Sequence, residues 1–176
     1  MPSAENTPRV TPPFELRDAV KATLPDANHD AALLHLTLLH LGRLVESSIQ
    51  SVITPEGLEM SEHSVLTALV FAGPPHTMSP TQLSQVILQT TSGMSKTLRR
   101  IERLGLIERI DDPNDGRARL VVLTEKGREM SERPLRQLVT QWSEQLKDLG
   151  ADELSNAANA VWALVPHMDP RFSTED

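Results

Sequence analysis

The basic residues of this 176-residue chain gather in one segment. From Gln89 to Arg136 the segment holds 11 of the 17 Lys and Arg residues but 8 of the 24 Asp and Glu residues, a balance of +3 in a chain of net charge -7. Clustered cations on an acidic body favour a local surface for a polyanion. A solvated face laced with salt bridges fits the same charges. The cations are Lys96, Arg99, Arg100, Arg103, Arg109, Arg117, Arg119, Lys126, Arg128, Arg133 and Arg136.

Helical spacing sorts part of this segment into two faces. At 100° per residue, one face is apolar and the other carries cations, hydroxyls and no carboxylate. The apolar face holds Met94, Leu98, Ile101 and Leu104. The polar face holds Ser92, Ser95, Lys96, Arg99 and Arg103. A B-DNA major groove, about 12 Å wide, admits one helix of this kind. An ordinary amphipathic helix with a basic outer face is the alternative.

The polar face has distinct chemistry for base edges and for phosphates. Arg99 is the candidate for reading guanine through O6 and N7. Ser92 and Ser95 can bond to a base edge or a phosphate. We expect Lys96, Arg100 and Arg103 to contact phosphates, which position a helix without carrying sequence information. Gly93, near the helix start, allows close approach to the DNA backbone.

A second basic feature follows a cluster of turn residues. Arg117 and Arg119 come after the turn at 112–116, and basic side chains on such a tip suit a narrow minor groove. Asp115 is expected to pair with an arginine of this tip and aim it. A turn-forming role for Asp115 is compatible with that pairing.

Secondary-structure signals predict a mainly α fold with a small β-hairpin. We expect helices over about 14–24, 30–53, 61–72, 80–88, 91–104, 125–149 and 152–166, and hairpin strands over 106–110 and 120–123. Ser61, Ser79, Thr90 or Thr91, and Thr124 are expected helix caps. The helix from Asp30 to Ile53 is apolar on nearly every side between Ala31 and Val45, so it needs cover on several sides, from its own domain and from a second subunit.

The order helix, helix, short helix, helix, hairpin is that of a winged helix-turn-helix. MSPTQLSQVI and TTSGMSKTLRRIERLGLIERIDDPNDGRARLVVLTEKG resemble the multiple antibiotic resistance regulator (MarR) family of bacterial transcription factors over about 60–128. The resemblance implies a homodimer on a pseudo-palindromic operator, with two recognition helices roughly 34–36 Å apart. The family's DxR wing motif falls on Asp115 and Arg117, and Gly116 stands where many members have a second arginine.

The resemblance also implies how the chain is divided. We expect a disordered leader at 1–13, N-terminal helices for dimerisation and the effector pocket at 14–59, and a DNA-binding winged helix-turn-helix at 60–128. C-terminal helices for dimerisation at 129–168 and a tail at 169–176 complete the division. The dimer interface maps to the first long helix, to the start of the continuation of the fifth helix and to the C-terminal helix around 157–165.

Family members are commonly released from DNA by small, often aromatic, effectors. The implied pocket lies between the dimerisation helices and the DNA-binding lobe. Its candidate lining residues are His40, Arg43, Ser47, His63, Thr67 and Phe71. Arg43 can hold an acidic effector, or it can pair with Glu46 or with a residue of the partner subunit. For each histidine, a satisfied core or surface position is the favoured alternative to a ligand contact.

Composition narrows the remaining function classes. The absence of Cys excludes disulfides, thiolate metal sites and thiol redox sensing. His35 and His40 lie about 140° apart on a helix, so we expect neither a metal site nor any other cofactor. Without a nucleophile elbow, P-loop or dinucleotide fingerprint, we expect no enzyme. With no apolar run of bilayer length and no signal peptide, we expect a cytoplasmic protein that does not enter the membrane. The alternative function is a winged-helix protein-interaction module that has lost DNA binding.

Overall fold

The chain divides into two compact units, 1–51 and 52–176, and we describe each by itself. The computed structural model describes residues 13–113, 115–169 and 171, without the side chains of residues 13, 14 and 117. The leader predicted at 1–13 therefore lies outside the described residues except for Pro13, and the tail predicted at 169–176 does so except for Asp169 and Arg171.

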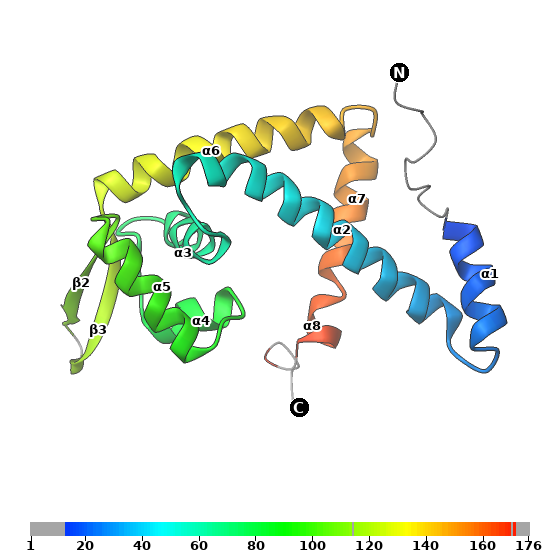
Figure 1. Ribbon diagram of the computed structural model, residues 1–176, viewed down its shortest axis with the longest axis horizontal. Helices are drawn as coiled ribbons and strands as arrows, with labels where there is room; N and C mark the ends of the chain where they lie inside the picture. The colour runs from blue at the N-terminus through cyan, green and yellow to red at the C-terminus, as the bar shows by residue number, and fades with distance from the viewer. Residues whose placement is uncertain (1–12, 114, 170, 172–176) are drawn as a thin grey trace, which may run out of the picture. The chain divides into compact units, whose positions relative to one another are not determined.

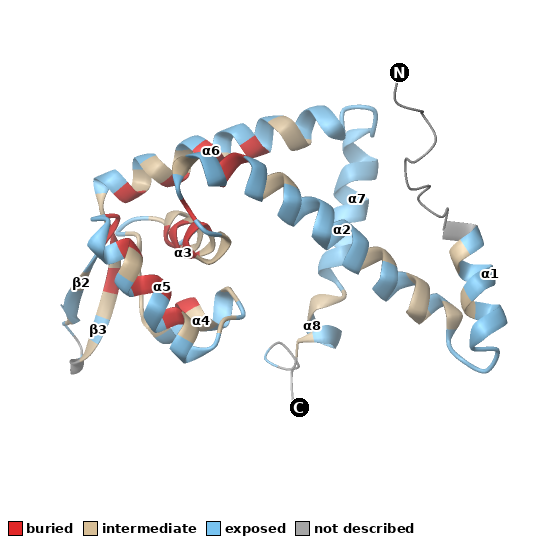
Figure 2. Cartoon of the chain, in the orientation of Figure 1, coloured by how far each residue is buried: buried red, intermediate tan, exposed pale blue. Residues whose placement is uncertain are grey.

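The first unit consists of two helices, both predicted from the sequence. Helix α1 is Pro13–Thr23, and α2 is His29–Ile53, whose last two residues belong to the second unit. Asn28 caps α2, because its Oδ1 accepts a hydrogen bond of 3.0 Å from the Ala31 amide. The buried residues of α2 are Val52 and Ile53 alone, so the predicted apolar stretch before them lies exposed or half-exposed (Figure 2).

The second unit contains the helix-turn-helix and a three-stranded sheet (Figure 1). Its elements are η1 Thr54–Glu56, α3 Met60–Phe71, β1 Thr77–Met78, α4 Pro80–Val86, α5 Thr91–Arg103, β2 Ile107–Asp112, β3 Asp115–Leu123, α6 Glu125–Gln145, α7 Ala151–Trp162 and α8 Val165–Met168. The predicted fold class, mainly α with a β-hairpin wing, is confirmed. Strand β1 was not predicted. It pairs with β3 to give the antiparallel order β1-β3-β2.

The hydrophobic core of the second unit lies beneath the helix-turn-helix. Helices α3, α4 and α5, strands β2 and β3 and helix α6 each contribute buried side chains to it (Figure 2). The largest of these are almost wholly inaccessible to solvent: Val65, Leu66, Leu69, Leu83, Met94, Leu98, Ile101, Leu106, Val121 and Leu138. A core of aliphatic side chains follows from a composition with 3% aromatic residues.

Three of the predicted helix caps are confirmed. Ser79 accepts from the Gln82 amide at 3.2 Å, Thr90 from Gly93 at 3.3 Å, and Thr124 from Gly127 at 3.0 Å. Ser61 is not the cap of α3. Glu59 takes that position, because the Glu62 carboxylate reaches back to the Glu59 amide at 2.9 Å and completes a capping box.

The hairpin strands are longer than the apolar pattern predicted. Most of the expected loop continues the strands, and the last paired residues are Asp112 and Asp115. Backbone hydrogen bonding extends this ladder past the last apolar side chains, with a bulge between Asp111 and Asp112. The described part of the wing is therefore a paired ribbon as far as Asp112 and Asp115.

Candidate nucleic-acid interface

Helix α5 is held by its apolar face. Met94, Leu98 and Ile101 are at most 1% exposed and pack into the core, as the helical spacing predicted. Leu104, the fourth residue of the predicted apolar stripe, is 41% exposed. The reason is local: α5 ends at Arg103, and Gly105 takes a positive φ of 71° that turns the chain away.

The opposite face of α5 is exposed and carries the predicted cations and hydroxyls. Ser92, Ser95, Lys96, Arg99 and Arg103 are all exposed. Arg99 donates from Nε to the Ser95 carbonyl at 3.1 Å, and Arg103 donates from Nε to the Arg99 carbonyl at 3.3 Å. These bonds use one nitrogen of each guanidinium and align the side chains along the helix.

The Glu102 carboxylate lies at the edge of this face, although the spacing of 100° per residue predicted a face without carboxylates. Lys96, Arg99 and Arg103 line one surface hollow together with Glu102. The Glu102 carboxylate is engaged by Arg109 of β2, whose Nε lies 3.1 Å from Glu102 Oε2. Arg109 thereby offsets the negative charge of Glu102, and the face stays predominantly basic.

Arg100 differs from the other three cations of α5. It forms an ion pair with Glu62 of α3 and donates to the Gly57 carbonyl at 3.3 Å. The hydrogen bond and the charge of Glu62 raise the pKa of Arg100 above its ordinary value. Spacing predicted a phosphate contact for Arg100, whereas its guanidinium is occupied within the chain.

Gly93 lies near the start of α5, where the sequence predicted close approach to a DNA backbone. It is half-buried, and a β-carbon there would come within 3.2 Å of the Gln89 and Thr90 side chains. The crowding around Gly93 thus comes from the neighbouring turn of this chain. Close packing within the chain therefore explains a glycine at this position without any DNA contact.

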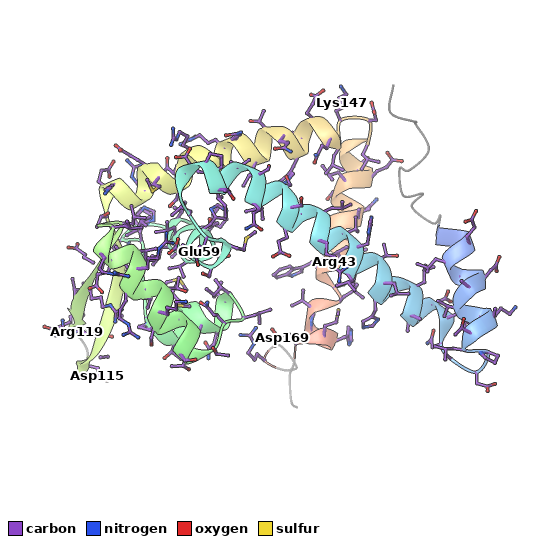
Figure 3. The ribbon with its side chains drawn as sticks, viewed as in Figure 1. Arg43, Glu59, Asp115, Arg119, Lys147 and Asp169 are labelled. Atoms are coloured by element: carbon purple, nitrogen blue, oxygen red, sulfur yellow. The ribbon has the colours of Figure 1, made fainter. Side chains whose placement is uncertain are left out.

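The wing carries an ion pair that the sequence did not predict. Arg119 Nε lies 3.0 Å from Asp111 Oδ1, between residues that face each other in the β2–β3 register. Both side chains are exposed, and Asp115 and Arg119 lie at the far end of the hairpin (Figure 3). The Arg117 side chain, which the wing prediction also uses, lies outside the described residues.

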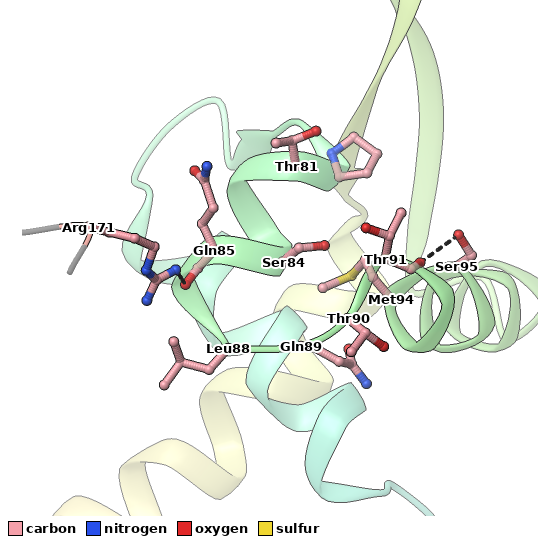
Figure 4. A pocket seen from close by; sticks show the side chains of 11 residues that line it. Thr81, Ser84, Gln85, Leu88, Gln89, Thr90, Thr91, Met94, Ser95 and Arg171 are labelled. Atoms are coloured by element: carbon pink, nitrogen blue, oxygen red, sulfur yellow. Dashed lines mark hydrogen bonds between the residues drawn. The ribbon is translucent and has the colours of Figure 1, made fainter. Parts of the chain in front are cut away.

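A cavity of about 540 Å³ opens between α4 and α5 (Figure 4). Hydroxyls of both helices line it, together with the amides of Gln85 in α4 and of Gln89 in the turn, and with Met94 of α5. Arg171 reaches its rim, donates to the Gln85 carbonyl at the end of α4, and is held by Asp169 with an Nε–Oδ1 distance of 2.8 Å. No sequence signal connects Arg171 with Gln85, because 86 positions separate them and neither belongs to a motif.

The candidate effector residues fall in both units. His40, Arg43 and Ser47 are exposed on α2 in the first unit. Arg43 has no ion pair among the residues that the structure describes (Figure 3). In the second unit, on α3, Phe71 is 71% exposed. The pocket assembled from both sets stays a prediction.

The two remaining effector candidates, His63 and Thr67, meet within α3. His63 is 5% exposed, and its Nε2 lies 3.5 Å from Thr67 Oγ1. The buried Nδ1 has no hydrogen-bond partner among the described residues. Burial disfavours the charged imidazolium and lowers the pKa of His63 below its ordinary value.

Neither a metal-binding cluster nor a membrane-spanning helix occurs in the described part of the chain. Within residues 13–113, 115–169 and 171, no group of three or more His, Asp or Glu side chains is placed to hold a metal ion. In the same residues, no helix has the length and apolar character needed to span a bilayer.

Comparison with known proteins agrees with the winged helix-turn-helix geometry. A profile of the MarR family matches residues 56–118. PecS, an HTH-type transcriptional regulator of Dickeya dadantii, is 26% identical over 103 residues, which are 58% of this chain and 62% of PecS. The chain thus spans somewhat less than two thirds of this curated relative. By its name this relative is a transcriptional regulator, the class of protein that the sequence favoured.

Solved structures share the fold over most of their length. Apo MarR of Escherichia coli has 26% identity and a TM-score of 0.59, covering 74% of this chain and 95% of MarR. An E. coli MarR mutant in complex with operator DNA has 23% identity and a TM-score of 0.65, covering 84% and 98%. NadR in complex with 4-hydroxyphenylacetate has 16% identity and a TM-score of 0.66, covering 74% and 91%. The last two likenesses show the fold alone.

The fold, the exposed basic face of α5 and the β2–β3 hairpin together define a winged helix-turn-helix protein. Residues 56–118 match the MarR family profile, which confirms the resemblance seen in the sequence.

Proposed function

We propose that this chain is a sequence-specific DNA-binding transcriptional regulator of the MarR type. The observation that carries the proposal is the outer face of α5, where Lys96, Arg99 and Arg103 are exposed while Met94, Leu98 and Ile101 fix the helix to the core. A rigid helix with cations on its outer face has the dimensions and charge to enter a major groove. PecS is such a regulator by name, and an E. coli MarR mutant has been solved with operator DNA.

Within this proposal the residues of the face have separate roles. Arg99 reads a base, and Lys96 and Arg103 bind phosphates. Ser92 and Ser95 add contacts near the helix start, and the wing arginines Arg117 and Arg119 follow the adjacent minor groove. A regulator that acts on chromosomal DNA works in the cytoplasm, so this location belongs to the same proposal.

A homodimer is the second part of the proposal. Helix α2 exposes large apolar side chains that water solvates poorly, and α7 does the same. In α2 these residues are Leu34, Leu36, Leu39, Leu41, Leu44 and Val45, each between 39% and 54% exposed. In α7 they are Leu154, Val161 and Trp162, between 42% and 71% exposed. A second copy that covers them would place two α5 helices on a pseudo-palindromic operator.

Release by a small effector is the third part. It is supported by NadR, a protein of the same fold solved with 4-hydroxyphenylacetate. The candidate contacts stay those predicted from the sequence: His40, Arg43 and Ser47 of α2, and His63, Thr67 and Phe71 of α3. An acidic aromatic molecule fits a site that contains Arg43. With such an effector, the regulator acts as a repressor that leaves its operator when the effector binds.

Two substitutions on α5 test the DNA-binding role. We expect Arg99→Ala to lower the preference for the operator over random DNA about ten- to hundredfold, because a bidentate base contact is lost. We expect Lys96→Ala to weaken binding to both duplexes similarly and to reduce the salt slope of log K by about 0.9. Fluorescence anisotropy with DNA from upstream of the gene, at several salt concentrations, measures both quantities.

The same titration separates the regulator from a winged-helix module that binds only proteins. If the parent chain shows no duplex affinity, or if both variants bind operator and random DNA as the parent does, the role assigned to α5 is contradicted. Adding aromatic acids to the parent complex tests the effector part, since an effector lowers the measured affinity.

A further inference from the structure

Arg100 joins α5 to the segment that enters the second unit from α2. Its guanidinium forms an ion pair with Glu62, lies 3.6 Å from Glu59 Oε1, and donates to the Gly57 carbonyl at 3.3 Å. Gly57 follows η1, four residues after the end of α2. One side chain therefore connects α5 with the start of α3 and with the chain that leads into it.

The partner of Arg100 is a buried acid. The Glu62 side chain is 1% exposed, and its Oε2 also accepts the Glu59 amide at 2.9 Å. Its other oxygen, Oε1, is buried with no hydrogen-bond partner among the described residues. A buried carboxylate needs a countercharge, and Arg100 is the cation that supplies it. If Arg100 left for a phosphate, Glu62 would stay buried without its countercharge.

A second polar contact lies beside this ion pair. Thr97 precedes Arg100 by three residues, so both lie on the flank of α5 that faces α3. Thr97 is 6% exposed, and its Oγ1 lies 3.4 Å from Ser61 Oγ and 3.3 Å from Gln89 Nε2. Arg100, Glu62, Thr97 and Ser61 form what we call the α3–α5 seam. Polar contacts of this kind fix a helix in rotation more narrowly than aliphatic packing does.

We propose that Arg100 is a positioning residue that sets the orientation of the base-reading face of α5 through the α3–α5 seam and does not bind phosphate. This inference rests on the proposed function. Lys96, Arg99 and Arg103 lie on the adjoining exposed face of the same helix, so a rotation of α5 moves all three relative to the groove. The orientation that the seam fixes decides whether Arg99 meets a base edge.

A variant that keeps the net charge separates positioning from phosphate binding. In R100Q/E62Q the ion pair is replaced by two neutral amides, so the total charge is that of the parent. We expect operator affinity to fall about 3- to 30-fold while affinity for random DNA and its salt slope stay unchanged. Anisotropy titrations of both duplexes over a range of salt concentrations give these quantities, and circular dichroism checks the fold.

Two further variants make the test decisive. Arg100→Lys keeps the charge but cannot make the ion pair and the Gly57 contact together, so we expect partial loss of operator preference with the parental salt slope. E144Q/K147Q is the matched control, since it removes an exposed ion pair at the end of α6 and should leave both duplex affinities unchanged.

The outcomes distinguish this inference from the proposed function. A salt slope reduced by about 0.9 in R100Q/E62Q would identify Arg100 as a phosphate contact and overturn the positioning role. Full operator preference in Arg100→Lys, or an unchanged preference in R100Q/E62Q, would overturn it as well. If the parent itself binds neither duplex, the proposed function fails, and the positioning role fails with it.

Discussion

At the scale of single residues, His63 links burial to the pH dependence of stability. The imidazole is 5% exposed, and burial lowers its pKa below the ordinary value of 6.5. As pH falls below 6.5, the unfolded chain takes up the proton before the folded chain does, so the free energy of unfolding falls until pH passes the lower folded pKa. We expect urea unfolding to show this loss as pH falls below 6.5, and His63→Gln to reduce it.

His35→Gln is the matched control, because it changes an exposed histidine of α2. If His63→Gln left the pH dependence of unfolding as steep as in the parent, another group would be responsible, and the argument from burial would be wrong.

Single residues were predictable where helical spacing alone decides the environment. Met94, Leu98 and Ile101 are buried and Lys96, Arg99 and Arg103 exposed, because all six lie within one straight helix. The ion pair of Arg100 was not predictable. Its partner Glu62 lies 38 positions earlier on another helix. Glu62 is buried by tertiary packing, which helical spacing along the sequence does not predict.

At the scale of elements, the start of α6 depends on a close approach that only glycine allows. Gly127 packs so tightly that a β-carbon there would lie 1.9 Å from the Leu106 carbonyl oxygen and 2.9 Å from Leu123 Cδ1. We expect Gly127→Ala to lower the free energy of unfolding by about 1–3 kcal/mol, because the helix must move away from the sheet. Thermal or urea unfolding of the variant measures the change.

Gly42 is a comparison position at which we expect an alanine substitution to change the free energy of unfolding in the opposite direction. A β-carbon at this position of α2 meets nothing within 4 Å, so Gly42→Ala should keep or raise the stability by up to about 1 kcal/mol through helix propensity. Equal stability changes for the two substitutions would contradict the role given to the close approach at Gly127.

Elements were predicted well where capping and turn residues mark their ends. Ser79, Thr90 and Thr124 begin helices as expected, since each hydroxyl accepts a nearby amide. Strand lengths in the wing and the whole of β1 were missed. In the ladder, Thr77 lies opposite Val122 and Asp111 lies opposite Arg119, and such pairing depends on register more than on side-chain type.

At the scale of the whole molecule, charge is divided between an acidic body and a basic helix. A net charge of -7 repels a polyanion at long range, while the exposed face of α5 attracts it locally. The face should therefore be the part of the chain that meets DNA, and salt should affect its affinity strongly. The division was visible in the sequence because the cations cluster in one segment. The sequence also predicted that the apolar α2 needs cover, and its leucines stay exposed in the described structure, so that cover is left to the proposed second copy.

The most direct test of the central claim makes use of a chain without cysteine. Ser95→Cys would place a single thiol on the exposed face of α5, where a DNA-cleaving iron chelate can be attached. We expect cuts in two clusters of major-groove positions whose centres lie about one helical turn apart, one for each α5 of a homodimer. The control is Ser143→Cys, at an exposed position of α6, which should give no localised cutting of the DNA. Diffuse cutting from position 95, or equal cutting from position 143, would contradict the claim that α5 lies in the groove.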